Sequence, residues 1–336
     1  MGSDHVATAP FPYFGGKRNV APEVWARFGA VRNYVEPFFG SGAVLLQRPS
    51  PFDGIETVND IDGLLVNFWR ATANAPDKVA QHADWPVSEC DLSARHIELV
   101  EARKELTGRL EGDPSYFDPR LAGWWVWGAC CWIGSGWCSG DGPWVRDGGF
   151  LTKKLPHLGD AGRGINKQLP HLGTAGQGIN KKLPHLGDAG RGINDWFNRL
   201  ASRMRAVRIT CGSWDRVLGP SVTWRHGITA VFLDPPYEDG SVDYSAGGMG
   251  LGISRRVAEW AIENGERKDM RIALCGYEGE HEMPGWSVFE WKARGGFGNQ
   301  DNDDANDNRH RERIWFSPSC LGARQGSLFD MGGSAK

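Results

Sequence analysis

The chain has 336 residues, of which 40% are hydrophobic and 24% charged, values typical of a globular protein with a full core. Its net charge of −3 excludes a protein that is basic overall, so a nucleic-acid partner must meet a local basic patch. The most apolar stretch, residues 121–137, is too short and too rich in glycine to span a membrane, and the start lacks a signal-peptide pattern. Seven cysteines without paired CxxC spacing favour free thiols in a reducing cytoplasm over disulfides or zinc.

The first part of the chain alternates helical and strand patterns. We expect helices over 17–29, 40–48 and 61–74, and strands over 33–38 and 55–60. The first helix is closed by Gly29. This order is a β-α-β unit followed by a second helix, which predicts a parallel sheet with crossover helices.

The pattern changes after this unit. Residues 76–110 are charged, with a helical period over 93–110, and residues 113–150 are rich in Trp, Gly and Cys. The tryptophans clustered at 124–144 suit the core of an inserted domain better than a base-stacking surface, although both readings remain open.

A fourteen-residue unit then occurs three times, at 153–166, 167–180 and 181–194. With one proline and three glycines each, three such units are too few and too polar for a solenoid, so we expect an extended surface loop. Its seven basic and two acidic side chains give a local charge of +5, which suits phosphate binding; alternatively the charge only keeps the loop soluble. The candidate DNA-binding residues are Lys153, Lys154, Arg163, Lys167, Lys181, Lys182 and Arg191. The repeated histidines (His157, His171, His185) reflect duplication and do not predict a metal site.

Strand and helix patterns return after the repeat. We expect a helix over 195–206, a helix over 254–265 with Ser254 as N-cap, and strands over 207–212, 229–234, 271–276, 286–291 and 312–317. The acidic and amide-rich run at 299–308 lacks the glycine and glutamate of an EF-hand and predicts a disordered loop. An α/β layer is therefore interrupted by an inserted domain.

The stretch "VFLDPPYEDGS" (231–241) joins a buried strand to a stiff turn. Because proline cannot donate to a β ladder, the strand must stop at Asp234, which leaves an acid and an aromatic (Tyr237) on a turn braced by Pro235 and Pro236. The simpler alternative is a strand that ends in a proline-capped turn.

The stretch "EPFFGSGAV" places Glu36 at a strand end and Gly40 and Gly42 where the chain turns into a helix. In that context glycines let a ligand approach the backbone, although a GxG can also be only a tight turn. Asp60, twenty residues after Gly40, can accept hydrogen bonds from ribose hydroxyls, or it can cap the following helix. Together these residues predict a nucleoside cofactor. A nucleoside triphosphate is excluded because GxxxxGK[ST] is absent.

The motifs "PYFGGKR", "EPFFGSGAVLL", "VNDID" and "FLDPPY" occur in the order found in Dam-like (class alpha) adenine-specific DNA methyltransferases. The resemblance covers residues 1–70 and those after Asn194. The middle resembles phage-encoded members in "WWVWGACCWIGSGWC" and "LPHLGDAGRGIN". The resemblance to Dam-like methyltransferases implies an α/β fold: a Rossmann-like S-adenosylmethionine-dependent methyltransferase sheet with an inserted, mainly helical target-recognition domain. We therefore expect a catalytic domain in two parts (1–75 and 195–320), an inserted domain (76–194, with the repeat at 153–194) and a tail (321–336).

The resemblance also implies roles for individual residues. Tyr13 and Lys17 would contact the methionine end of the cofactor, with Lys17 on its carboxylate; the alternative is a solvated lysine after a Gly-Gly turn. The remaining cofactor-binding candidates are Glu36, Phe38, Gly40, Gly42, Asp60 and Asp234. Ser213 departs from the family, whose members commonly have an acidic residue there, near the adenine of the cofactor.

The chemistry of "DPPY" suits transfer to an exocyclic amine. Asp234 and a main-chain carbonyl of the Pro235–Pro236 turn would each accept a hydrogen bond from one N–H of the amine. Tyr237 would stack on a base flipped out of the duplex. We therefore expect an S-adenosylmethionine-dependent methyltransferase that acts on N6 of adenine in double-stranded DNA. We also expect a monomer or weak dimer, no membrane or metal partner, and a bacterial or phage-infected bacterial cytoplasm, with restriction-modification as a context. The alternatives are methylation of RNA adenine or a protein amide, or a DNA-binding relative inactivated by the change at Ser213.

Overall fold

The computed structural model describes residues 8–11, 13, 16–132, 137–138, 144–147, 150–153, 192–236, 252–291 and 312–322. Several of the predictions above lie outside these residues. They are Tyr237, the repeat from Lys154 to Arg191 with its three histidines, and the run at 299–308.

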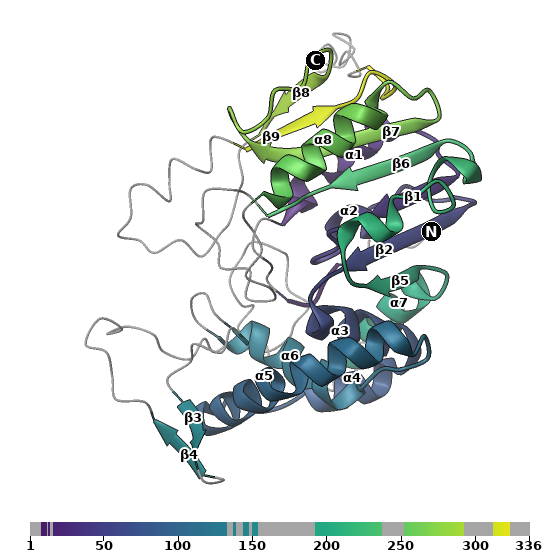
Figure 1. Cartoon of the computed structure of the whole chain (residues 1–336). Helices are drawn as coiled ribbons and strands as arrows, with labels where there is room; N and C mark the ends of the chain where they lie inside the picture. The colour runs from purple at the N-terminus through teal and green to yellow at the C-terminus, as the bar shows by residue number, and fades with distance from the viewer. Residues whose placement is uncertain are drawn as a thin grey trace, which may run out of the picture.

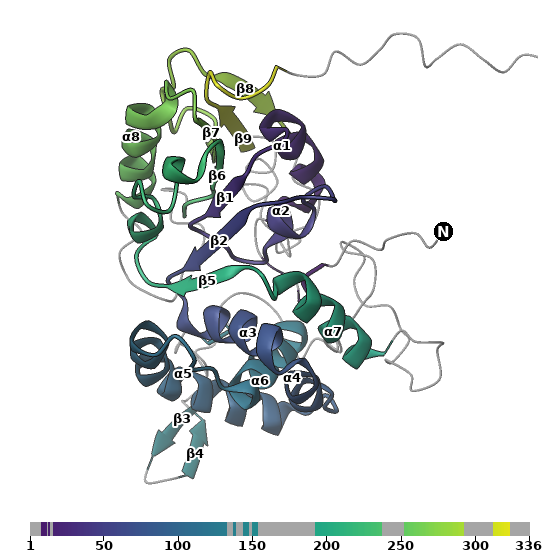
Figure 2. The same cartoon turned by 90° about the vertical axis from the view of Figure 1, so that its right-hand side faces the viewer.

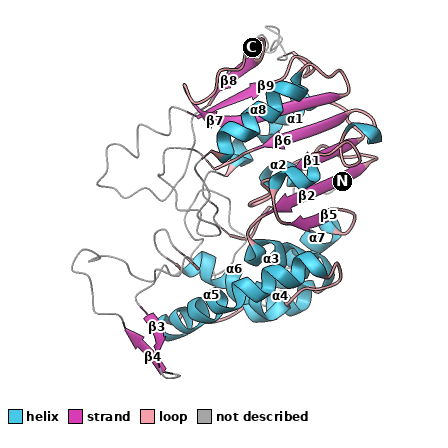
Figure 3. Cartoon of the chain, viewed as in Figure 1, coloured by secondary structure: helices cyan, strands magenta, loops and turns pink. Residues whose placement is uncertain are grey.

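A seven-stranded sheet in the order β5-β2-β1-β6-β7-β9-β8 forms the centre of the α/β part (Figures 1 and 3). Five neighbouring strands run parallel, and β9 lies antiparallel between β7 and β8. The predicted parallel α/β sheet is thus confirmed, with one antiparallel strand added. The strands are β1 (Asn33–Glu36), β2 (Ile55–Asp60), β5 (Arg208–Cys211), β6 (Thr229–Leu233), β7 (Met270–Tyr277), β8 (Ser287–Glu290) and β9 (Glu312–Phe316).

Both faces of the central strands are buried, which explains the largely apolar runs in β6 and β7. Along β6, Phe232 belongs to one hydrophobic cluster and its neighbours Val231 and Leu233 to the other. Helices α1 (Ala21–Phe28) and α2 (Ala43–Leu46) cover the first face, and α8 (Ile253–Gly265) covers the second (Figure 1). Short 3₁₀ helices complete the layer: η1 (Lys17–Asn19), η2 (Trp214–Val217) and η3 (Trp224–His226).

A helical body lies beside β5 (Figure 2). It contains α3 (Gly63–Asn74), α4 (Pro76–Ala83), α5 (Glu89–Gly112), α6 (Pro119–Cys131) and α7 (Ile193–Met204). The tryptophans of α6 support the core reading, since Trp125 and Trp127 are buried. The hairpin of β3 (Trp144–Asp147) and β4 (Phe150–Lys153) projects from the end of this body (Figure 1).

The helical body does not separate cleanly at the expected domain boundaries. Helices α3 and α7, which the sequence assigned to the catalytic domain, share one hydrophobic cluster with α4 and α6 of the insertion. The division at residues 75 and 194 therefore stays a prediction. Among the described residues, no helix has the length and apolar character needed to cross a bilayer.

Three local expectations are wrong. The helix expected over 17–29 begins only at Ala21, because residues 17–19 form a 3₁₀ turn before Pro22 enters the first turn of α1. Ser254 is not the N-cap of α8: Gly252 occupies that position, and the buried Ser254 hydroxyl donates to Glu280. Asp60 does not cap α3, because Asp62 accepts the capping bond from the backbone of Leu64.

A buried ion cluster connects the two sequence halves of the sheet. Glu56 on β2 is 2% exposed and contacts Arg48 Nη1 at 3.0 Å and Arg203 Nη1, from α7, at 2.7 Å. Both guanidinium groups also donate to backbone carbonyls, those of Val31 and Leu45. The carboxylate therefore satisfies two cations that lie on opposite sides of the insertion.

Removing this carboxylate should strongly destabilise the fold, because the buried Arg48 and the partly buried Arg203 would lose their counter-charge. We expect Glu56→Ala to lower the free energy of unfolding by about 3–5 kcal/mol. Glu105→Ala, which breaks an exposed i,i+4 pair with Arg109, is the matched control and should cost less than about 1 kcal/mol. Urea denaturation measures both changes, and equal costs would contradict the assigned role of Glu56.

Candidate active site

The carboxyl ends of the parallel strands bring the predicted acids to one edge of the sheet. Glu36 ends β1, Asp60 ends β2, and Asp234 follows β6. From β1 the chain continues to β2 on one side, while β6 pairs with β1 on the other. Open α/β sheets bind ligands at such a reversal of strand order, outside the carboxyl ends of the strands. The predicted site residues thus share the edge where a ligand is expected.

The glycine turn after β1 is tied to Asp60. Gly40 has φ +49° and Gly42 φ +63°, a region that favours glycine. The Gly40 N–H donates to Asp60 Oδ2 at 3.0 Å. A Cβ on Gly40 would lie 2.6 Å from the ring of Tyr13, so that ring packs directly on the turn. Tyr13, the glycine turn and Asp60 are therefore neighbours in the structure.

The side chain of Asn59 links the chain segments that follow β1 and β5. Its side-chain amide is buried and donates to the carbonyl oxygens of Pro37 (3.1 Å) and Gly212 (2.9 Å), which follow β1 and β5. One side chain on β2 therefore fixes the ends of both neighbouring strands. Asn59 lies within the "VNDID" motif, whose sequence alone did not indicate this role.

Asp60 is desolvated but remains partly exposed. Burial raises the pKa of its carboxyl to about 6, and hydrogen bonds from the backbone of Asp62 and Gly40 oppose the rise. The next side chain, Ile61, is 51% exposed. An anionic acceptor and an apolar surface lie side by side here, a combination suited to a ribose and an attached base.

An aromatic pair lies beyond the turn. The rings of Phe38 and Trp214 stack with their centroids 6.3 Å apart and 23° between their planes. Trp214 opens η2 after β5, and Ser213 before it is exposed. The sequence drew attention to Ser213 but did not predict that Trp214 stacks on Phe38. The two rings meet because they follow β5 and β1, which lie on either side of β2.

Lys17 lies between two carboxylates. Its Nζ is 3.1 Å from Asp234 Oδ1 and 3.6 Å from Glu312 Oε2, and the side chain is 4% exposed. Burial alone would lower the pKa of Lys17, but the two carboxylates outweigh it and hold the pKa above its usual value. The alternative of a solvated lysine is therefore wrong. Glu312, at the start of β9, is a member of the cluster that no sequence motif indicated.

The strand ends at Leu233, as the two prolines require, and Asp234 emerges 23% exposed with Pro235 buried behind it. The Cys275 thiol on β7 neighbours Asp234, and burial raises its pKa, so that it stays neutral. Glu36 is 2% exposed, accepts a hydrogen bond from Tyr34 Oη at 2.8 Å, and has a pKa raised by burial. Glu36 is therefore a buried residue at the end of β1, held by the Tyr34 hydroxyl.

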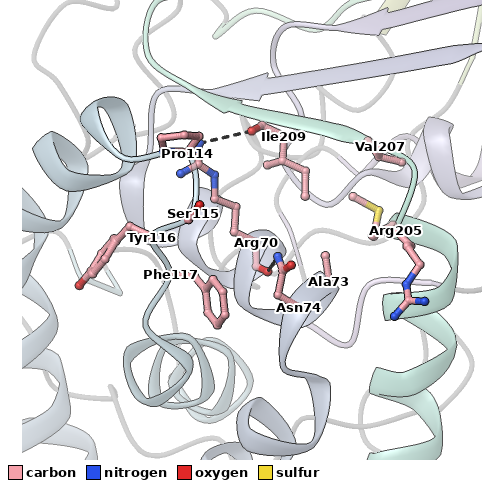
Figure 4. A pocket seen from close by; sticks show the side chains of 11 residues that line it. Arg70, Ala73, Asn74, Pro114, Ser115, Tyr116, Phe117, Arg205, Val207 and Ile209 are labelled. Carbon is pink, nitrogen blue, oxygen red and sulfur yellow. Dashed lines mark hydrogen bonds between the residues drawn. The ribbon is translucent and has the colours of Figure 1, made fainter.

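A pocket of about 490 Å³ lies elsewhere, between α3, the α5–α6 connection and the start of β5 (Figure 4). Arg70 occupies it, and its guanidinium donates to the carbonyl oxygens of Leu110, Asp113 and Ile209. Since the guanidinium N–H groups of Arg70 donate to backbone carbonyl oxygens, we assign this residue a structural role. Of the DNA-binding candidates, only Lys153 falls within the described residues, at the end of β4.

Part of the chain matches a known family. A model of the D12 class N6 adenine-specific DNA methyltransferases matches residues 13–107, from Tyr13 into the C-terminal part of α5. No curated protein matches the chain. The matched segment contains Lys17, the glycine turn and Asp60.

Proposed function

We propose that this chain, whose residues 13–107 match the D12 class of N6 adenine-specific DNA methyltransferases, takes a methyl group from S-adenosylmethionine and transfers it to N6 of a flipped-out adenine in double-stranded DNA. One observation carries the proposal. Asp234 lies at the end of β6, on the same sheet edge as the glycine turn and Asp60. An acceptor for an amine thus neighbours a surface suited to a nucleoside.

The described residues fit this cofactor. Asp60 would accept hydrogen bonds from the ribose hydroxyls, with Ile61 and the Phe38–Trp214 pair along the adenine ring. Gly40 and Gly42 let the ligand approach the backbone, and Tyr13 covers the turn on the methionine side. When bound, S-adenosylmethionine supplies a methyl group activated by a sulfonium charge.

Asp234 would orient the amine. Its carboxylate would accept a hydrogen bond from one N–H of the amine, and a carbonyl of the following Pro-Pro turn would accept one from the other N–H, which together would fix the direction of the nitrogen lone pair. The nitrogen would gain the methyl group that the cofactor supplies and would lose one proton to solvent. Positive charge would develop on the nitrogen during transfer, and the Asp234 carboxylate beside it would stabilise that charge. Tyr237 would stack on the base.

Lys17 would act mainly on Asp234. A lysine that also binds the cofactor carboxylate has to share one ammonium among three carboxylates, since Asp234 and Glu312 already contact it. We therefore infer that Lys17 fixes the Asp234 side chain and contributes less to cofactor affinity than Asp60.

DNA would bind along the hairpin and the repeat, which follow α6 and precede α7. Within the hairpin, Trp144 pairs with Lys153 and Arg146 with Leu151, so basic residues occur on both strands. The basic repeat units continue directly from Lys153. Their charge supports contact with phosphates, which positions a duplex without reading its sequence.

Removing the acceptor should stop the reaction. We expect Asp234→Asn to lower the methyl-transfer rate at least about 100-fold, because the contact stabilises charge only in the transition state. Tritium transfer from labelled cofactor to duplex DNA measures the rate, with RNA and whole-cell protein as alternative acceptors. Asp269→Asn, at the opposite end of β7 in an exposed pair with Arg267, is the control. A variant that keeps more than about a tenth of the rate would exclude Asp234 from this role.

Asp60 should make cofactor binding depend on pH. With a pKa of about 6, its carboxyl is ionised above that pH and protonated below it, so affinity should fall as the pH drops through 6. Asp60→Asn should weaken binding by about 1–3 kcal/mol at pH 8 and flatten the pH profile. Calorimetry without DNA tests both. An unchanged affinity in the variant would place the ribose elsewhere.

Shortening the repeat should weaken DNA binding without unfolding the protein. Helix α7 begins at Ile193, and joining Asn166 to Asp195 replaces Gly192–Ile193–Asn194 with the identical Gly164–Ile165–Asn166. The deletion of 167–194 removes four basic residues and one acidic residue. We expect unchanged cofactor affinity and a slope of log K against log salt that is shallower by up to about three. A filter-binding salt titration measures the slope, and an unchanged slope would show that the repeat does not contact phosphates.

A further inference from the structure

We propose that Glu312 is a positioning residue for methyl transfer, because it holds Lys17 between itself and Asp234 and leaves the catalytic edge with a net negative charge. The inference rests on the proposed role of Asp234 as the acceptor of the target amine. It concerns a residue on β9, far in the sequence from every motif of the family resemblance.

The antiparallel strand brings Glu312 to the site. The acids Glu36, Asp60 and Asp234 lie at the carboxyl ends of parallel strands, whereas Glu312 begins β9, which runs the opposite way. In the register of the sheet it pairs with Tyr277 at the end of β7, and β7 lies between β6 and β9. Lys17 bridges this intervening strand, with Asp234 on one side and Glu312 on the other.

Burying the Glu312 carboxylate costs free energy that its structural contacts offset only in part. Its side chain is 8% exposed, and its Oε2 makes no hydrogen bond among the described residues. Burial raises its pKa, Lys17 opposes the rise, and Asp234 adds to it. Glu56, by contrast, has hydrogen bonds from two arginines. With one ammonium at 3.6 Å, the Glu312 carboxylate has less to offset its desolvation than Glu56 has.

The summed charge of Lys17, Asp234 and Glu312 gives a functional reason for the Glu312 carboxylate. Lys17 and Asp234 alone form a neutral pair, which gives little stabilisation to a positive charge that develops on the amine. Glu312 adds a second negative charge, so the three groups together carry −1 when Lys17 is protonated and both acids are ionised. It also draws the ammonium partly away from Asp234, which leaves that carboxylate available to the amine.

The test is a neutral substitution of nearly the same shape. We expect Glu312→Gln to lower the single-turnover transfer rate at saturating cofactor and DNA by about tenfold, less than direct removal of an active-site contact. Cofactor and DNA dissociation constants should stay within about twofold, since the group touches neither ligand. Glu290→Gln on the neighbouring β8, which is exposed, is the matched control and should leave the rate unchanged.

A double-mutant cycle with Lys17→Met distinguishes this role from a purely structural one. If Glu312 acts by balancing Lys17, its substitution should have little further effect once the lysine is gone, so the two losses should not multiply. Multiplied losses, an unchanged rate in Glu312→Gln, or a Glu312→Gln protein that does not fold would each overturn the inference. The Asp234→Asn result separates the two proposals, because an active Asp234→Asn enzyme refutes the acceptor itself, whereas an unaffected Glu312→Gln enzyme refutes only the positioning.

Discussion

The parallel pairing of β1 with β2 and β6 is the constraint on which the rest of the molecule depends. Strands that are covered on both faces cannot carry exposed polar side chains along their length, so polar groups accumulate where the strands end. Parallel direction then brings these ends to one edge. Glu36, Asp60 and Asp234 come together because each is the last residue of a buried strand or the first after it.

Two buried carboxylates on this sheet show how the same chemistry serves different purposes. Glu56 lies within β2, away from the edge, and two guanidinium groups satisfy both of its oxygens. Glu312 lies at the edge, and among the described residues the contact of its Oε2 is the Lys17 ammonium at 3.6 Å. The first arrangement stabilises a buried charge within the fold. The second gives the carboxylate fewer partners, which fits the positioning role that we propose for Glu312.

Much of the α/β part could be predicted from the sequence because its signals are local. Strand patterns ended by "ND" or "DPP" marked the strands, and the glycines after β1 marked the turn. The family match at residues 13–107 confirms the resemblance for the motifs up to Asp62, whereas "DPPY" lies outside the matched residues. Contacts between distant segments could not be read in this way. Glu312 reaches Lys17 only because β9 inserts antiparallel beside β7, and "ERIWF" contains nothing that specifies that direction. Helix α6 was hidden for a different reason, since tryptophan and glycine are weak helix formers and its helical state depends on burial against α3 and α4.

The position of the insertion follows from the same topology. Strands β2 and β5 are parallel neighbours, and a parallel pair always needs a long crossover between its members. In this chain the crossover contains α3, the α4–α6 helices, the hairpin, the repeat and α7. Its two ends are fixed independently of its length: Asp60 and Asn59 hold the exit from β2, and Arg203 on α7 returns to Glu56. Because loop-closure entropy grows slowly with length, this crossover can gain or lose repeat units while the edge that carries Asp60 and Asp234 stays in register. This is why we expect that the segment proposed to bind DNA can vary in length without disturbing the edge proposed for methyl transfer.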